Sequence, residues 1–233
     1  MIKVVSFKIC PFVQRVTALL EAKEIPYEIE YISLNDKPQW FLDISPTGQV
    51  PVLITDSGEA LFESDAIVEY LNEIALPLES GLTPEQRARD RAWSYQAAKN
   101  YLLQCSAQRS KDEQTLAERS EKLSKVFERA EKALGQGPFF KGATLSNVDI
   151  AWLPLLHRAA IIKARSGYDF IVDYPKVKAW QTAILNTGLP EKSVPEDFEK
   201  LFTDFYLSEN TFLGGNKAST HNLDNSCANG SCC

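Results

Sequence analysis

Cys10 stands where a thiol could act as a nucleophile. It follows an apolar, β-branched run over residues 3–7 and precedes Pro11, a residue that suits the first turn of a helix. The apolar residues that come next have helical spacing: Phe12, Val16, Leu19 and Leu20. The sequence therefore places Cys10 between a strand and the N-terminal end of a helix, where unpaired N–H groups and the helix dipole favour a thiolate.

The position of Cys10 alone leaves two interpretations open. A thiol with the ordinary pKa of ~8.5 is only about 3% ionised at pH 7, and a pKa about two units lower would make the thiolate the main form. A free cysteine is equally often a small buried apolar residue with no chemistry. The residue three positions on is Val13, so an external thiol would have to complete any redox cycle.

The elements expected around Cys10 form one α/β layer over residues 1–75. Alternation and β-branching predict the strands, and apolar residues at helical spacing predict the helices. The first crossover should make two strands parallel, and a turn at 56–58 should close an antiparallel hairpin. In chain order we expect a strand at 3–7, a helix from 11 to before Pro26, a strand at 27–31, a helix at 37–41, strands at 50–54 and 60–62, and a helix at 64–74.

The rest of the chain reads as a linker, a helical domain and a tail. Residues 76–83 have the composition of a linker, and no strand-like alternation recurs beyond them. The helical domain is expected over 84–207, and a capping box from Ser146 to Asp149 should start one of its helices. Residues 208–233 are expected to be a disordered tail. Long helices are predicted over 84–109 and 112–134, and a further helix after Pro175.

Composition excludes several classes of protein. The 233 residues carry a net charge of −6 without a dense basic run, which argues against nucleic acid as a partner. Neither a signal peptide nor a membrane span is readable, so we expect a cytoplasmic protein with no membrane partner. The odd cysteine count is not a disulfide framework. Prenylation at Cys232–Cys233, or a soft metal on the tail thiols with His221, is not favoured, and no metal is expected.

Four segments within residues 3–75 resemble the N-terminal domain of cysteine-type cytosolic glutathione transferases, above all the omega class and the plant dehydroascorbate reductases. The resemblance implies a thioredoxin-like domain followed by an all-α domain, and the Ser146–Asp149 box resembles the capping motif of that second domain. The segments are Ile9-Cys-Pro-Phe-Val-Gln-Arg15, Asp36 to Pro46, Gln49-Val-Pro-Val-Leu53 and Phe62-Glu-Ser-Asp-Ala-Ile67.

The resemblance gives roles to residues of these segments. Pro51 should follow a cis peptide bond and leave the Val50 backbone to pair with the cysteinyl part of glutathione, as a strand edge would. Glu63 should hold the α-ammonium of the ligand and Ser64 its γ-glutamyl carboxylate. An ordinary edge-strand proline and a simple helix cap are the alternatives for Pro51 and Ser64.

Two further residues of the segments complete the implied glutathione site. Lys37 should reach the glycyl carboxylate, although the sequence alone would make it a solvated surface lysine. Phe12 lies in the segment around Cys10 and is implied as a wall of the site.

The second substrate should bind between the domains, opposite Cys10. Aromatic residues at helical spacing are more often core than pocket, and His157 on an apolar helix is more often a hydrogen-bonded core residue than a base. The candidates are Trp93, Tyr95, Tyr101, Arg109, Trp152, His157 and Arg158.

The resemblance implies a glutathione-dependent thiol transferase or dehydroascorbate reductase that works through Cys10 and a mixed disulfide. Glutathione is then a co-substrate, beside a small oxidised or electrophilic substrate, and the family implies a homodimer. Conjugation of electrophiles as the main role is one alternative. A non-catalytic protein of the same fold, similar to the intracellular chloride channel proteins, is the other.

Overall fold

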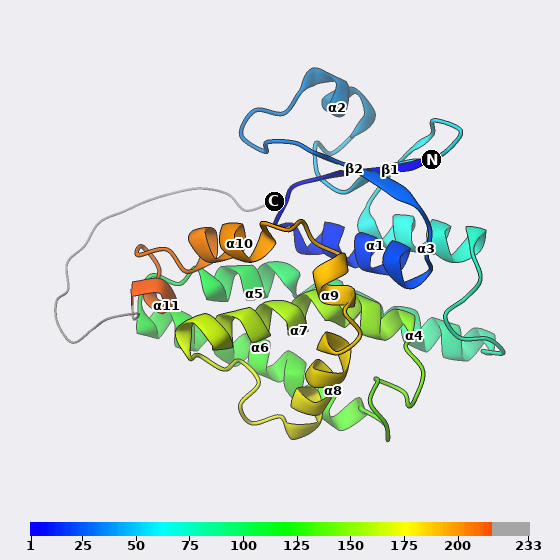
Figure 1. Cartoon of the computed structure of the whole chain (residues 1–233). Helices are drawn as coiled ribbons and strands as arrows, with labels where there is room; N and C mark the ends of the chain where they lie inside the picture. Colours follow the sequence, from blue (N-terminus) through cyan, green and yellow to red (C-terminus); the bar gives the residue numbers. More distant parts are fainter. Residues whose placement is uncertain (216–233) are drawn as a thin grey trace.

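A four-stranded mixed sheet forms the N-terminal domain of the structure, a computed structural model that describes residues 1–215 (Figure 1). The strand order is β2-β1-β3-β4, with β1 parallel to β2 and antiparallel to β3, and β3 antiparallel to β4. This is the predicted parallel crossover followed by a hairpin. The strands are β1 (Ile2–Ser6), β2 (Tyr27–Tyr31), β3 (Val52–Ile54) and β4 (Ala60–Phe62).

Three helices complete this domain: α1 (Pro11–Ala22), α2 (Gln39–Ile44) and α3 (Ser64–Ile74). Figure 1 shows α1 and α3 between the sheet and the helical domain, and α2 on the opposite side of the sheet. Of the apolar residues of α1 that have helical spacing, Val16, Leu19 and Leu20 are buried and Phe12 is partly buried. The predicted short helix at 37–41 is displaced to Gln39–Ile44, because Pro38 precedes it as the N-cap.

The helical domain surrounds α7, which is buried along most of its length. The predicted capping box forms at its start, where Asp149 accepts the backbone N–H of Ser146 at 2.8 Å. The helices are α4 (Pro84–Ala98), α5 (Tyr101–Gln108), α6 (Glu113–Ala133), α7 (Asn147–Ser166), α8 (Pro175–Leu185), α9 (Leu189–Lys192), α10 (Phe198–Tyr206) and α11 (Phe212–Gly215).

The single helix predicted over 84–109 is wrong, because the chain breaks at Lys99 and Asn100. The side-chain amide of Asn100 donates to the Gln96 carbonyl at 2.6 Å, while its backbone N–H bonds to Ala97 O. A side chain that bonds to the backbone in this way competes with the helical ladder. α4 therefore ends at Ala98, and α5 starts as a separate helix.

The helices continue beyond residue 207, the expected end of the helical domain. α11 packs against the end of α10, and a Cβ atom on Gly214 would lie 2.2 Å from the carbonyl oxygens of Leu207 and Ser208. Only glycine allows this close approach of the backbone. The expectations for His221, Cys227, Cys232 and Cys233 fall on residues outside the described part of the chain.

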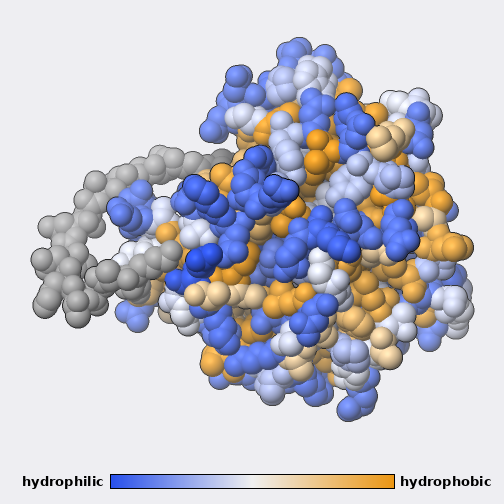
Figure 2. Space-filling view, in the orientation of Figure 1, coloured by the Kyte–Doolittle hydropathy of each residue, from blue (hydrophilic) through white to orange (hydrophobic). Residues whose placement is uncertain are grey.

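The two domains meet along α1 and α7, and polar contacts also join them. Thr17 donates its hydroxyl to Ser193 O at 2.7 Å, and Lys8 pairs with Asp197 at 2.7 Å. Hydrophilic side chains cover much of the face in Figure 2, with apolar areas between them. Among the helices of residues 1–215, none combines the length and the apolar character needed to cross a membrane.

Candidate active site

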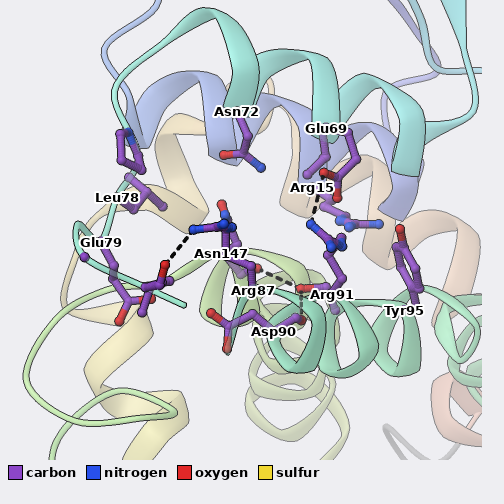
Figure 3. A pocket seen from close by; sticks show the side chains of 15 residues that line it. Arg15, Glu69, Asn72, Leu78, Glu79, Arg87, Asp90, Arg91, Tyr95 and Asn147 are labelled. Atoms are coloured by element: carbon purple, nitrogen blue, oxygen red, sulfur yellow. Dashed lines mark hydrogen bonds and ion pairs between the residues drawn. The ribbon is translucent and has the colours of Figure 1, made fainter. Parts of the chain in front are cut away.

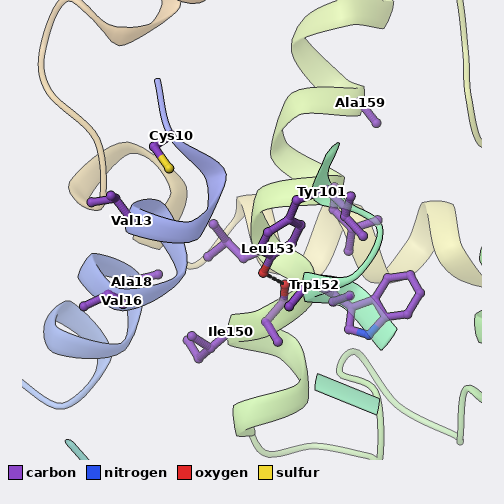
Figure 4. Packing of buried hydrophobic residues seen from close by; sticks show 14 of the residues in the cluster. Cys10, Val13, Val16, Ala18, Tyr101, Ile150, Trp152, Leu153 and Ala159 are labelled. Atoms are coloured by element: carbon purple, nitrogen blue, oxygen red, sulfur yellow. Dashed lines mark hydrogen bonds between the residues drawn. The ribbon is translucent and has the colours of Figure 1, made fainter. Parts of the chain in front are cut away.

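Cys10 is the N-cap residue of α1, as its sequence position predicts. Its N–H donates to Phe7 O at 3.0 Å, and its carbonyl accepts the first helical bond from Gln14 N at 3.1 Å. The residue is 2% exposed. Figure 4 shows its side chain at the start of α1, across from Tyr101 and Leu153 of the helical domain. The thiol thus lies at the positive end of a 12-residue helix, at the boundary of the two domains.

A cavity of about 150 Å³ opens beside this helix end. It reaches α1 at Phe12, two residues after Cys10, and its other walls come from the loop before β3, the start of α3 and α5. The structure therefore brings together five residues that the sequence singled out for glutathione. The lining residues are Phe12, Thr47, Gln49, Val50, Pro51, Glu63, Ser64, Asp65 and Leu102.

The Val50–Pro51 peptide bond is cis, as the resemblance implied. The ladders of β3 begin at Val52, which pairs with Val5 on one side and Phe62 on the other. The Val50 backbone precedes both ladders and lines the cavity. An extended ligand could therefore pair with it as a strand does.

The start of α3 offers backbone N–H groups to the cavity. Glu63 is the N-cap with a φ of 65°, a conformation that non-glycine residues adopt rarely and that clusters at functional sites. The first N–H that the helix itself uses is that of Ile67, which donates to Glu63 O at 3.0 Å. The N–H groups of Ser64 and Asp65 are thus available to an anion at a helix N-terminus.

Asp65 lines the cavity, although no role was predicted for it. Its carboxylate pairs with Arg15, whose side chain is only 2% exposed. The signal was present in the sequence, since Asp65 lies inside the segment that resembles the family. Thr47 and Gln49 also line the cavity and were missed; they flank Gly48 in a loop whose conformation no periodicity predicts.

Lys37 lies next to the cavity but does not line it. Its ammonium group donates to Gly48 O at 2.8 Å, and Gly48 stands between the lining residues Thr47 and Gln49. The lysine therefore lies behind the loop that forms one edge of the cavity. Its contact with a ligand stays a prediction.

None of the seven second-substrate candidates lines this cavity. Trp152 is a core residue and Trp93 is partly buried against the core, with the Trp152 indole N–H donating to Trp93 O at 3.1 Å and the ring centroids 6.4 Å apart. Arg109 stacks over the Phe205 ring at 4.7 Å. Of the helical domain, Leu102 reaches the cavity instead.

His157 is also part of the core. Its Nδ1 lies 2.8 Å from the Gln14 amide nitrogen, and its ring stacks on Phe198 with centroids 5.5 Å apart. Burial, together with the nearby positive charge of Arg158, lowers the pKa of His157 to about 3. The imidazole is therefore neutral near pH 7, as expected of a hydrogen-bonded core histidine.

Tyr101 links the helical domain to α1. Its ring meets the Phe12 ring edge-on at 5.1 Å, and its hydroxyl donates to Ala151 O. Burial raises the pKa of Tyr101, a shift that the charges of Arg15 and Arg158 oppose. Tyr101 thus supports Phe12, a wall of the cavity, from behind.

A larger cavity of about 460 Å³ lies on another side of the domain boundary, between α3, the linker and α4 (Figure 3). Tyr95 lines this cavity, and the residues expected to hold glutathione do not. Its polar lining residues include Arg15, Glu69, Asn72, Arg87, Asp90 and Arg91. The smaller cavity is lined by five of the residues expected to bind glutathione and reaches α1 two residues after Cys10, so we place the candidate active site there.

Comparison with known proteins matches both domains. A model of the glutathione S-transferase N-terminal domain matches residues 9–74, and one of the C-terminal domain matches residues 94–187. Glutathione S-transferase omega-1 of Sus scrofa is 31% identical over 89% of this chain and 86% of its own length. Probable glutathione S-transferase DHAR1, cytosolic, of Oryza sativa subsp. japonica is 32% identical over 76% of this chain and 80% of its own length.

A solved structure has the same fold. Glutathione transferase Omega 3C of Trametes versicolor has a TM-score of 0.72 and 26% identity, over 84% of this chain and 89% of its own. Together with the two domain models and the cis-proline site beside Cys10, these similarities show that the chain belongs to the glutathione S-transferase family.

Proposed function

We propose that this protein is a glutathione-dependent thiol transferase and dehydroascorbate reductase in which Cys10 is the nucleophile. One observation carries the proposal: a cysteine, rather than a hydroxyl residue, caps the helix whose second residue, Phe12, lines the cavity. A sulfur nucleophile in that place favours disulfide exchange over conjugation. The relatives named omega-1 and DHAR1 support the same activities.

Glutathione is proposed to bind along the loop before β3 and the start of α3. Its cysteinyl backbone would pair with Val50, and its γ-glutamyl carboxylate would accept from Ser64 and the adjacent helix N–H groups. Glu63 would bind the α-ammonium group, and Lys37 the glycyl carboxylate. This orientation directs the glutathione sulfur toward the N-terminal end of α1, where Cys10 lies.

The proposed reaction has two exchange steps. The Cys10 thiolate attacks the glutathione sulfur of a mixed disulfide; a new S–S bond forms, the old one breaks, and the other thiol leaves as a thiolate. A glutathione thiolate then attacks the Cys10 adduct, which releases glutathione disulfide and restores Cys10. With dehydroascorbate, two glutathione molecules supply the electrons and protons that form ascorbate, and they leave as glutathione disulfide.

The proposal also covers the oligomeric state and the cellular compartment of the protein. We expect a homodimer in the cytosol, as the family commonly forms two-fold dimers and one relative is named cytosolic. Sedimentation or light scattering of the purified chain would measure its oligomeric state. The chemistry proposed above needs only one subunit.

Mass spectrometry tests the proposal directly. The purified protein is mixed with glutathione disulfide, digested without reduction, and its five cysteines are mapped for the adduct. We expect glutathione on the peptide that contains Cys10, and its release when reduced glutathione is added. An adduct on other cysteines alone, with Cys10 unmodified, would contradict the proposed nucleophile.

Replacement of Ser64 by alanine is expected to raise the KM for glutathione about tenfold and to leave kcat nearly unchanged. The substitution removes one hydroxyl bond to a charged carboxylate, which is worth about 1.5 kcal/mol or more, while the helix N–H groups remain. Steady-state kinetics with varied glutathione measures the effect. Ser80→Ala, at an exposed linker serine, is the matched control. An equal change in the KM for glutathione in both variants would show that Ser64 does not bind glutathione.

A further inference from the structure

Arg158 on α7 is a fully buried cation with an unusual set of partners. Its Nη2 donates to Ile9 O at 3.2 Å, and its Nη1 donates to the side-chain oxygen of Gln14 and to Pro154 O at 3.4 Å. Its Nε has no hydrogen-bond partner. The rings of Phe198 and Phe202 lie 5.3 and 5.9 Å from the guanidinium carbon.

None of the ion pairs within residues 1–215 gives Arg158 a carboxylate partner. A buried charge without a counter-charge is costly, because it has lost its hydration and gained only neutral dipoles. Arginine keeps its proton nonetheless. Any nearby group that can become an anion would therefore stabilise the buried charge of Arg158.

The ionisable groups that act electrostatically on the Arg158 guanidinium include thiols and phenols. They are Cys10 before α1, Tyr101 and Cys105 on α5, and Tyr206 on α10, with neutral His157 beside it on α7. Burial lowers the pKa of Arg158, and those four groups oppose the shift. Of the four, Cys10 directly follows Ile9, the residue whose carbonyl Arg158 binds, and it caps α1.

We propose that Arg158 is a positioning residue for the Cys10 nucleophile: its guanidinium fixes the backbone at Ile9 and the side chain of Gln14, and it supplies the buried positive charge that the thiolate faces. The inference rests on the proposed function of Cys10. It assigns to the helical domain a part in the chemistry of the N-terminal domain, because Arg158 reaches across the boundary from α7 to the start of α1.

The test is the pH dependence of Cys10 alkylation by iodoacetamide, followed by mass spectrometry of the Cys10 peptide in the full chain. Removal of the charge in Arg158→Met should move the inflection of this profile upward by about one pH unit or more, since an opposite charge nearby favours the thiolate. Arg158→Lys, which keeps the charge, should restore most of the wild-type profile. Arg165→Met, at a half-exposed arginine of the same helix, is the matched control and should change nothing.

A second variant guards against misfolding of Arg158→Met. Arg158→Gln removes the charge but keeps an amide that can donate and accept among the polar partners of Arg158, so it should also move the inflection upward. If both variants fold by circular dichroism and the inflection stays at its wild-type position, Arg158 is only structural and the proposal is wrong. Failure of the proposed function looks different: wild-type Cys10 would then form no glutathione adduct at all.

Discussion

Replacement of Cys10 by serine is expected to lower the rates of hydroxyethyl disulfide and dehydroascorbate reduction by at least about 100-fold. A serine hydroxyl fits the same N-cap position but stays protonated near neutral pH and cannot form a disulfide with glutathione. Glutathione should still bind, because its partners lie on the loop before β3 and on α3. Steady-state rates of the purified variant with each oxidised substrate measure the loss.

The same variant should gain activity in the conjugation of chlorodinitrobenzene. A hydroxyl at the helix end can donate to the thiolate of bound glutathione, which then attacks the electrophile instead of exchanging with Cys10. Cys105→Ser is the matched control, since it removes a buried thiol of the helical domain and keeps a polar atom for Tyr206, whose hydroxyl lies 3.1 Å from Cys105 Sγ. If Cys10→Ser reduced the oxidised substrates at the wild-type rate, a group other than Cys10 would be the nucleophile.

Local patterns predicted the N-terminal domain to within a few residues. The helix expected over 64–74 is α3, since Ile67, Val68 and Leu71 repeat with helical spacing and are buried. The turn expected at 56–58 closes the β3–β4 hairpin, where Gly58 has a φ of 88°. These features depend on neighbours in the chain, which a single sequence displays.

Features that depend on side-chain competition or on distant packing were not predicted. The break at Asn100 comes from one amide bond to Gln96 O, which apolar spacing does not reveal. Periodicity also shows that a side chain points away from solvent, but it does not show whether that side chain packs in the core or lines a cavity. Trp93, Trp152 and His157 therefore looked like pocket candidates and lie in or against the core, whereas Leu102, 45% exposed beside buried Tyr101, lines the cavity.

Five of the residues expected to bind glutathione line one cavity, because a family resemblance carries backbone conformation as well as residue type. The cis bond before Pro51 and the helix start at Ser64 bring together segments 13 residues apart in the chain. No spacing rule would have placed Val50 and Glu63 at one cavity. Neither local patterns nor the family resemblance predicted the proposed role of Arg158, because that role follows from the lack of a carboxylate partner for Arg158 among the described residues of the folded chain.

Asp149 holds together the helical domain that carries Arg158 and Tyr101. Its carboxylate is fully buried and accepts four hydrogen bonds within 2.8 Å. Two come from the N–H and hydroxyl of Ser146, one from the N–H of Phe140 and one from the indole N–H of Trp180. The one side chain thus joins the start of α7, the loop before it and α8.

Asp149→Ala is expected to lower the free energy of unfolding by about 3 kcal/mol or more, because the buried donors of Phe140, Ser146 and Trp180 each lose their acceptor. Urea unfolding followed by circular dichroism measures the change. Asp112→Ala removes the exposed N-cap of α6, whose donor, the N–H of Thr115, can bond to water instead. This variant should therefore lower the free energy of unfolding far less than Asp149→Ala. Equal losses in the two variants would mean that the Asp149 cluster acts as an ordinary helix cap. Because α7 positions Arg158, activity should fall along with stability in Asp149→Ala.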